Sequence, residues 1–167
     1  ADDVAITGFH IEGVGNATRE PGTDLGAPAE EWDARFERAY GQGDAGVGVA
    51  NVTGTYVGDV TIETPANGMI FLNAPGGVIE DVRVDGTEDW QEGFMGVASV
   101  RSRLVVQDST FVGGRDGVYL HRGDGTVIRN STFRDQRYGV HTMFTSRTLI
   151  ANNVARGEAF AGIVIMT

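Results

Sequence analysis

The segment Val127-Ile128-Arg129-Asn130-Ser131-Thr132-Phe133 recurs along the chain and decides its fold. Closely similar segments span residues 105–111, 78–84, 56–62 and 149–155, and a weaker copy spans residues 5–11. The five better copies place apolar residues around a central Asp or Asn, and most neighbouring copies lie about 22 residues apart. Repeats of this length are typical of solenoids, in which each repeat contributes one rung.

A second repeated segment is a glycine followed by an apolar residue, and its first five copies begin 9 or 10 residues before the matching copies of the first segment. Its six glycines are Gly46, Gly68, Gly96, Gly117, Gly139 and Gly162. Two short strands per repeat and no repeated helix predict an all-β chain, a right-handed parallel β-helix (solenoid) of about six rungs. The right hand follows from the general preference of parallel crossovers.

The alignment of the repeats assigns structural roles to two positions. One position holds Asp or Asn in five rungs. We expect these side chains to stack as a ladder and to form hydrogen bonds with the backbone of the turn. Catalysis by the same carboxylates is the weaker interpretation. These residues are Asp59, Asp81, Asp108, Asn130 and Asn152. Another position is predicted to form a core stack of Ile62, Val84, Phe111 and Phe133.

We expect residues 1–167 to form a single domain with two insertions, at 12–45 and 85–95. The first insertion predicts a short helix over residues 28–40, which either caps the solenoid or docks a partner. The second is a loop that carries Trp90 and four acidic residues. The chain ends on an apolar strand, residues 162–167, so we expect it to be a fragment of a longer chain or to associate through this open end.

Composition excludes several functional classes. The net charge of −10 argues against nucleic acid as a partner, the absence of Cys excludes thiol chemistry, and no apolar run is long enough to span a membrane. All the basic residues are Arg. Together with the acidic charge, this favours a halophilic protein, although a GC-rich genome would also deplete Lys.

Histidine and methionine gather at equivalent places in the last three rungs. Residues two apart in a strand share a face, so we expect one outer face to carry His121, His141, Met143 and Met166. The interior is expected to take Val118, Leu120, Val140, Ile163 and Ile165. Imidazole and thioether ligands without Cys suit Cu(I), while ordinary packing is the alternative for the methionines.

Two segments at these residues resemble the NosD family. They are Gly114-Arg115-Asp116-Gly117-Val118-Tyr119-Leu120 and Arg137-Tyr138-Gly139-Val140-His141-Thr142-Met143-Phe144, followed by a rung that ends in Met166. The close resemblance covers residues 114–167. Thr142 stands where the family usually has an aromatic residue.

The resemblance implies an exported, periplasmic or extracytoplasmic accessory protein, not an enzyme, that matures nitrous oxide reductase by binding or handing over copper. Its implied partners are an ABC permease and its ATPase subunits, a copper chaperone and nitrous oxide reductase. The main rival is a carbohydrate-binding or carbohydrate-active β-helix. The active form, a lyase or hydrolase, would need carboxylates, or a carboxylate with Arg115 or Arg137, in an outward groove. A purely structural surface solenoid is a further alternative.

Overall fold

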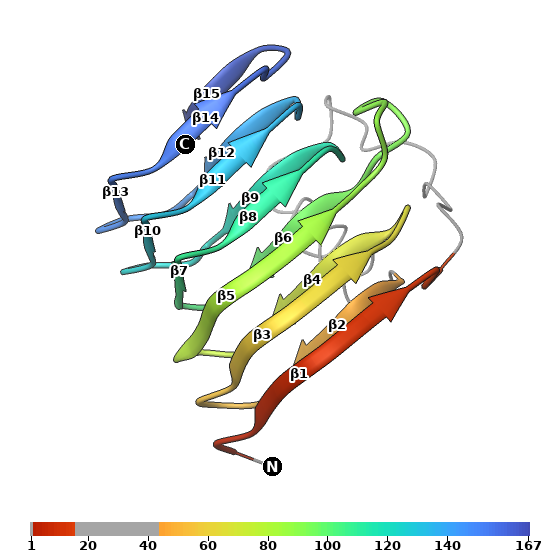
Figure 1. Ribbon diagram of the computed structural model, residues 1–167. Coiled ribbons are helices and arrows are strands. Elements are labelled where there is room, and N and C mark those ends of the chain that lie inside the picture. Colours follow the sequence, from red (N-terminus) through yellow and green to blue (C-terminus); the bar gives the residue numbers. More distant parts are fainter. Residues whose placement is uncertain (1, 16–43) are drawn as a thin grey trace.

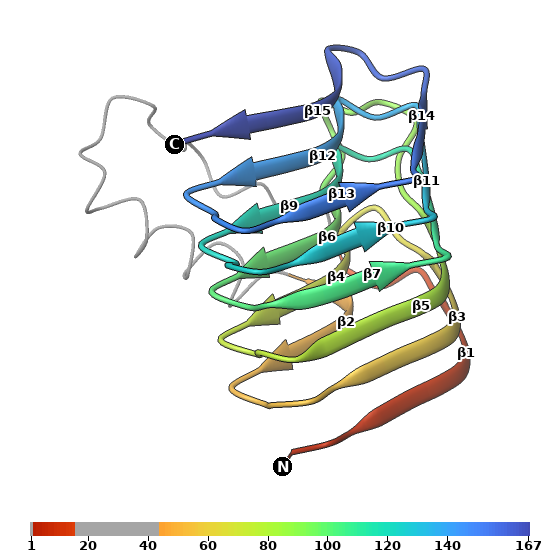
Figure 2. The same ribbon diagram turned by 90° about the vertical axis from the view of Figure 1, so that its left-hand side faces the viewer.

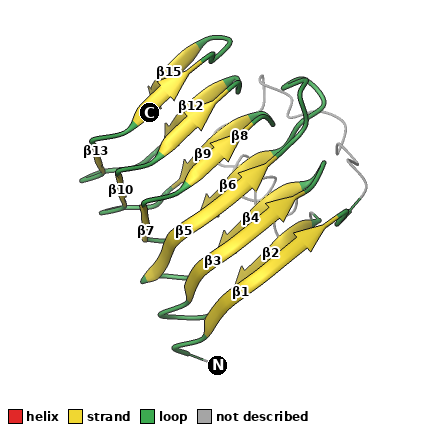
Figure 3. Ribbon diagram, viewed as in Figure 1, coloured by secondary structure: helices red, strands yellow, loops and turns green. Residues whose placement is uncertain are grey.

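The computed structural model describes residues 2–15 and 44–167 as a stack of parallel strands (Figure 1). Equivalent segments of successive repeats pair in register, as Val127 does with Val105 and Phe133 with Phe111. Figure 3 shows strands and loops and no helix in the described residues. The predicted all-β parallel solenoid is therefore confirmed.

In the described residues the strands form two sheets. The first sheet holds β1 (Ala5–Glu12), β3 (Tyr56–Glu63), β5 (Gly77–Asp85), β7 (Leu104–Gln107), β8 (Thr110–Val112), β10 (Val127–Arg129), β11 (Thr132–Arg134), β13 (Leu149–Ala151) and β14 (Val154–Arg156). The second sheet holds β2 (Ala45–Ala50), β4 (Asn67–Leu72), β6 (Met95–Val100), β9 (Asp116–His121), β12 (Tyr138–Met143) and β15 (Ala161–Met166). Figure 2 shows the strands of the second sheet stacked one above the other.

The Asp and Asn position of the repeat bends the first sheet. Its five residues have φ angles between 52° and 56°, a left-handed conformation that Asp and Asn tolerate better than most residues. Gly8 takes the equivalent place in β1, with φ 70°. In the last three rungs the bend divides the segment into two strands, such as β7 and β8. These rungs therefore have three strands where the sequence predicted two.

The turn ladder is built by the residue after each bend. The Ser109 hydroxyl accepts from the Val82 amide at 3.1 Å, and the Ser131 hydroxyl accepts from the Ser109 amide at 3.3 Å. The Asn153 side-chain oxygen continues the series by accepting from the Ser131 amide at 2.9 Å. In the described residues a ladder exists, but the side chains that form it are not the predicted ones. The Asp and Asn residues supply the backbone conformation of the turn, and the residues after them supply its hydrogen bonds.

The repeated glycines allow successive rungs of the second sheet to approach each other. A Cβ atom at Gly117 would lie 2.4 Å from the Phe133 ring and 2.6 Å from the carbonyl oxygen of Gly139. A Cβ atom at Gly96 would lie 2.5 Å from the carbonyl oxygen of Gly117. Any larger residue would push the rungs apart, which explains the recurrence of glycine here.

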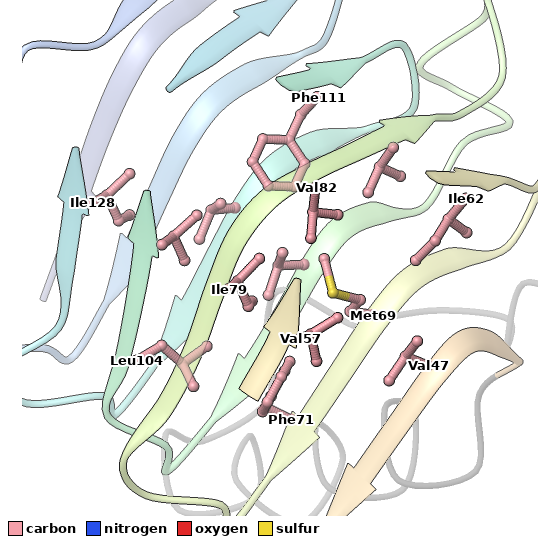
Figure 4. Packing of buried hydrophobic residues seen from close by; sticks show 14 of the residues in the cluster. Val47, Val57, Ile62, Met69, Phe71, Ile79, Val82, Leu104, Phe111 and Ile128 are labelled. Carbon is pink, nitrogen blue, oxygen red and sulfur yellow. The ribbon is translucent and has the colours of Figure 1, made fainter. Parts of the chain in front are cut away.

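The predicted core stack is confirmed. Ile62, Val84, Phe111 and Phe133 are buried in one continuous apolar cluster, and Figure 4 shows part of this cluster with Ile62 and Phe111 labelled. The Phe111 and Phe133 rings stack with their centroids 5.4 Å apart. Val118, Leu120 and Val140 belong to the same cluster, as expected. Ile163 and Ile165 are exposed, because β15 pairs only with β12 among the described strands, so their predicted burial is wrong.

The two insertions interrupt the stack where the sequence placed them. β1 ends at Glu12 and β2 begins at Ala45, while β5 ends at Asp85 and β6 begins at Met95. The helix predicted over residues 28–40 lies outside the described residues. In residues 2–15 and 44–167, no helix is long and apolar enough to cross a membrane.

Candidate metal centre

The second sheet brings the predicted histidine and methionine residues together. Met143 of β12 pairs with His121 of β9 on one side and with Met166 of β15 on the other. His141 lies two residues before Met143 and pairs with Tyr119. Because β9, β12 and β15 are neighbours (Figure 2), these side chains form two adjacent rows on three strands.

This face differs from the open surface that the sequence suggested. Met143 and Tyr119 pack in a second apolar cluster, separate from the solenoid core, together with Ile70, Met95 and Ala98. The exposed fraction is 0% for His121, 6% for His141 and 8% for Met143, and rises to 39% only for Met166. The candidate ligands are therefore largely shielded from water.

A buried ion pair holds His141 in place. The Nδ1 atom of His141 lies 2.9 Å from Oδ2 of Asp116, the first residue of β9, whose side chain is fully buried. Arg137, just before β12, donates from Nε to Oδ1 of Asp116 at 2.8 Å and from Nη2 to Oδ2 at 2.6 Å. The Arg137 amide also donates to the Arg115 carbonyl at 2.7 Å, which fixes the backbone beside β9.

These contacts assign the proton of the His141 ring. A carboxylate accepts hydrogen bonds, so the contact with Asp116 places the proton of a neutral His141 on Nδ1. The Nε2 atom then carries a lone pair. It is buried and has no hydrogen-bond partner among the residues that the structure describes. A carboxylate on one ring nitrogen with the other nitrogen free is the usual environment of a metal-binding histidine.

Tyr119 connects the candidate ligands. Its hydroxyl donates to the Met143 Sδ at 3.3 Å and lies 3.5 Å from the Nδ1 of His121. Its ring meets the His141 ring edge-on, with centroids 5.0 Å apart. Tyr119 therefore contacts three of the four residues predicted as metal ligands.

The sequence did not identify Asp116, Arg137 or Tyr119 as parts of this site. It named Arg137 for the rival carbohydrate-active interpretation, and the structure pairs Arg137 with Asp116. The link to His141 was missed because Asp116 and His141 lie 25 residues apart and occupy different positions of the repeat. An acidic residue at the start of one strand, beside a histidine on the next, is the signal that could have found it.

A second group of metal-ligating residues lies on the first sheet. The Nε2 atom of His10 in β1 is 3.2 Å from Glu12 and 3.3 Å from Glu63 of β3. All three side chains are more than half exposed. These contacts are an ordinary surface ion pair when His10 is protonated.

Comparison with known proteins supports the fold. A family model described as "Right handed beta helix region" matches residues 8–154, in agreement with the predicted hand. No curated protein and no solved structure shows significant similarity to the chain.

Proposed function

The chain belongs to the right-handed β-helix family, and on this premise we propose that it is a non-catalytic carrier that binds Cu(I) on one face of its solenoid and hands it to a partner. The observation that carries the proposal is the buried Nε2 atom of His141. Burying a polar atom without a hydrogen-bond partner costs free energy, unless a bound ligand supplies the missing interaction.

The chemistry of the neighbouring side chains favours copper in its reduced state. Met143 lies on the same face as His141, and Met166 lies beside Met143 on the next strand. Thioethers are soft ligands that suit Cu(I), whereas zinc sites use Cys, His and carboxylates. We assign His141, Met143 and Met166 as ligands. His121, which is fully buried and close to the Tyr119 hydroxyl, is the fourth candidate.

The biological setting of the proposal rests on the resemblance to the NosD family. In that setting the protein acts outside the cytoplasm and receives Cu(I) from a copper chaperone. It works beside an ABC permease and its ATPase subunits, and it serves the copper–sulfur centre of nitrous oxide reductase. The open rung at β15 offers exposed Ile163 and Ile165 for association with a second copy or a partner.

One observation favours the rival interpretation in its binding form. Phe160 is exposed and meets Trp90 edge-on at 5.4 Å and Tyr138 at 6.1 Å, which creates an aromatic surface of the kind that packs against apolar faces of ligands such as sugars. The catalytic form has less support. Asp116 is fully buried and is bonded to both Arg137 and His141, so it is not available in an outward groove.

Anaerobic competition for Cu(I) against a chromogenic chelator tests the proposal. We expect the wild-type protein to bind one Cu(I) ion. His141→Gln should weaken binding by about 100-fold and Met143→Leu by about 10-fold, because even the loss of a residue that hydrogen-bonds to a metal ligand commonly weakens metal binding by about 10-fold to 100-fold. His10→Gln is the matched control and should bind like the wild type. Equal Cu(I) affinity in wild-type and His141→Gln protein, both shown to be folded by circular dichroism, would contradict the proposal. Cleavage of a uronic-acid polymer would favour the rival.

A further inference from the structure

The charges next to His141 balance each other. Asp116 carries one negative charge, Arg137 carries one positive charge, and His141 must be neutral to bind a metal. In the described residues, Asp116 is the only carboxylate that pairs with Arg137. Among the described residues that contact His141, the two charges therefore cancel, and the ligands that the site offers a metal ion are neutral nitrogen and sulfur atoms.

Arg137 is held firmly in this arrangement. Its guanidinium makes two hydrogen bonds to Asp116, and its Cζ atom lies over the Tyr138 ring, 4.4 Å from the centroid. Only 14% of its side chain is exposed. Because a guanidinium keeps its positive charge in proteins, Arg137 offsets the negative charge of the Asp116 carboxylate.

From this charge balance we infer that Arg137 selects the charge of the bound ion, so that the site accepts a monovalent soft cation and rejects divalent ones. The inference rests on the proposed function. Moving an ion from water into a shielded site costs free energy that grows with the square of its charge. A divalent ion needs an anionic ligand or neighbour to offset this cost. Asp116 could be that anionic neighbour, but the positive charge of Arg137 cancels its negative charge.

Removing the charge of Arg137 should reverse the preference. Asp116 would then present an uncompensated negative charge behind His141. A histidine backed by a carboxylate is the arrangement found at zinc sites. The negative charge of Asp116, close to an ion bound at His141, attracts a divalent ion more strongly than a monovalent one. We expect the affinity of the site for a divalent ion, relative to that for a monovalent ion, to rise by about tenfold or more.

The test compares Ag⁺, a redox-inert monovalent soft cation, with Zn²⁺ by calorimetry on the full chain. We expect the ratio of Zn²⁺ affinity to Ag⁺ affinity to rise about tenfold or more in Arg137→Gln. Arg137→Lys, which keeps the charge, should retain the wild-type ratio. Arg129→Gln is the matched control, because Arg129 is exposed on the other sheet and bonds to Gln107. An unchanged ratio in folded Arg137→Gln overturns the inference.

A measurement on the wild-type protein keeps the inference testable if Arg137→Gln does not fold. Stoichiometric Ag⁺ should shift the ¹⁵N resonance of His141 Nε2, and stoichiometric Zn²⁺ should not. Equal binding of both ions at His141 would overturn the inference and leave the proposed metal site standing. If neither ion shifts this resonance, the proposed function itself is overturned, so the two failures are distinguishable.

Discussion

His141 and His10 both contact carboxylates, but they lie in different sheets and in opposite environments. His10 is on β1, in the first rung, and uses its Nε2 atom for contacts with Glu12 and Glu63, all more than half exposed. His141 is on β12, four rungs higher in the stack (Figure 1), and uses Nδ1 for its contact with the buried Asp116. Arg137 balances the charge of Asp116, whereas among the described residues His10 alone pairs with the two glutamates of the exposed group.

The comparison shows that the presence of ligating residue types does not by itself identify a site. Water can form hydrogen bonds with every polar atom of the exposed His10 group, so its side chains need no bound ligand. At His141 one ring nitrogen is fixed and the other is buried without a partner among the described residues. Burial and an unpaired lone pair distinguish the stronger candidate from the more obvious cluster.

The largest expected difference between the two regions is in stability. Asp116→Asn leaves the charge of Arg137 without its buried partner, so the free energy of unfolding should fall by about 3–5 kcal/mol. Urea denaturation measures this free energy. Asp108→Asn is the control, because it makes the same change at an exposed residue of the turn. A loss below about 1 kcal/mol, as for a surface pair, would mean that the two regions do not differ energetically.

The exposed group should respond weakly and in a salt-dependent way. Glu63→Gln should lower the free energy of unfolding by less than about 1 kcal/mol at low ionic strength, because water screens the pair with His10. The loss should vanish near 1 M NaCl, where the screening length falls to about 3 Å. The same salt series on Asp116→Asn should leave its loss largely intact. A salt-independent loss for Glu63→Gln would show that this pair is effectively buried.

The smallest effect is expected at Glu158, a partly buried carboxyl that accepts a hydrogen bond from the Gln136 amide at 2.8 Å. Burial raises the pKa of Glu158, and Asp135 adds to the rise, although the Gln136 amide bonds the carboxylate and opposes it. The raised pKa means that the ionised form is disfavoured in the folded state. Stability is therefore highest when Glu158 is protonated, and it is lost as the pH rises through the pKa of the folded carboxyl.

Glu158→Gln removes this cost and should slightly increase the free energy of unfolding at neutral pH, by less than the Glu63→Gln loss. The difference from wild type should disappear in acid, where Glu158 is protonated in both states. Thermal unfolding of both proteins at neutral pH and in acid measures this difference. A variant that is less stable than wild type at neutral pH would reveal a favourable contact of the carboxylate.

Much of the architecture could be read from the repeat. The positions of Phe111 and Phe133 predicted their stacking, and the alignment of Asp108 with Asn130 predicted the turn. Such predictions succeed because each rung repeats the same local environment, so one correct alignment places every equivalent residue. They fail at the last rung, where Ile165 has the interior pattern and is nevertheless exposed.

The candidate site was only partly predictable for the same reason. The repeat placed His121, Met143 and Met166 in one row because they occupy one repeat position. It could not place Asp116 against His141, since these residues occupy different positions and meet only through the way that neighbouring strands lie side by side. Contacts that are not periodic leave no periodic signal.

The sequence by itself determined the solenoid, its turns, its glycine spacing and the face on which His and Met gather, because these follow from local conformation repeated in register. Only the tertiary structure decided that His121, His141 and Met143 on this face are buried. It also decided that Arg137 balances the charge of Asp116 and that the Nε2 atom of His141 has no partner among the described residues. Those properties depend on distances between unlike positions and on the exclusion of water, and neither is encoded in the repeat.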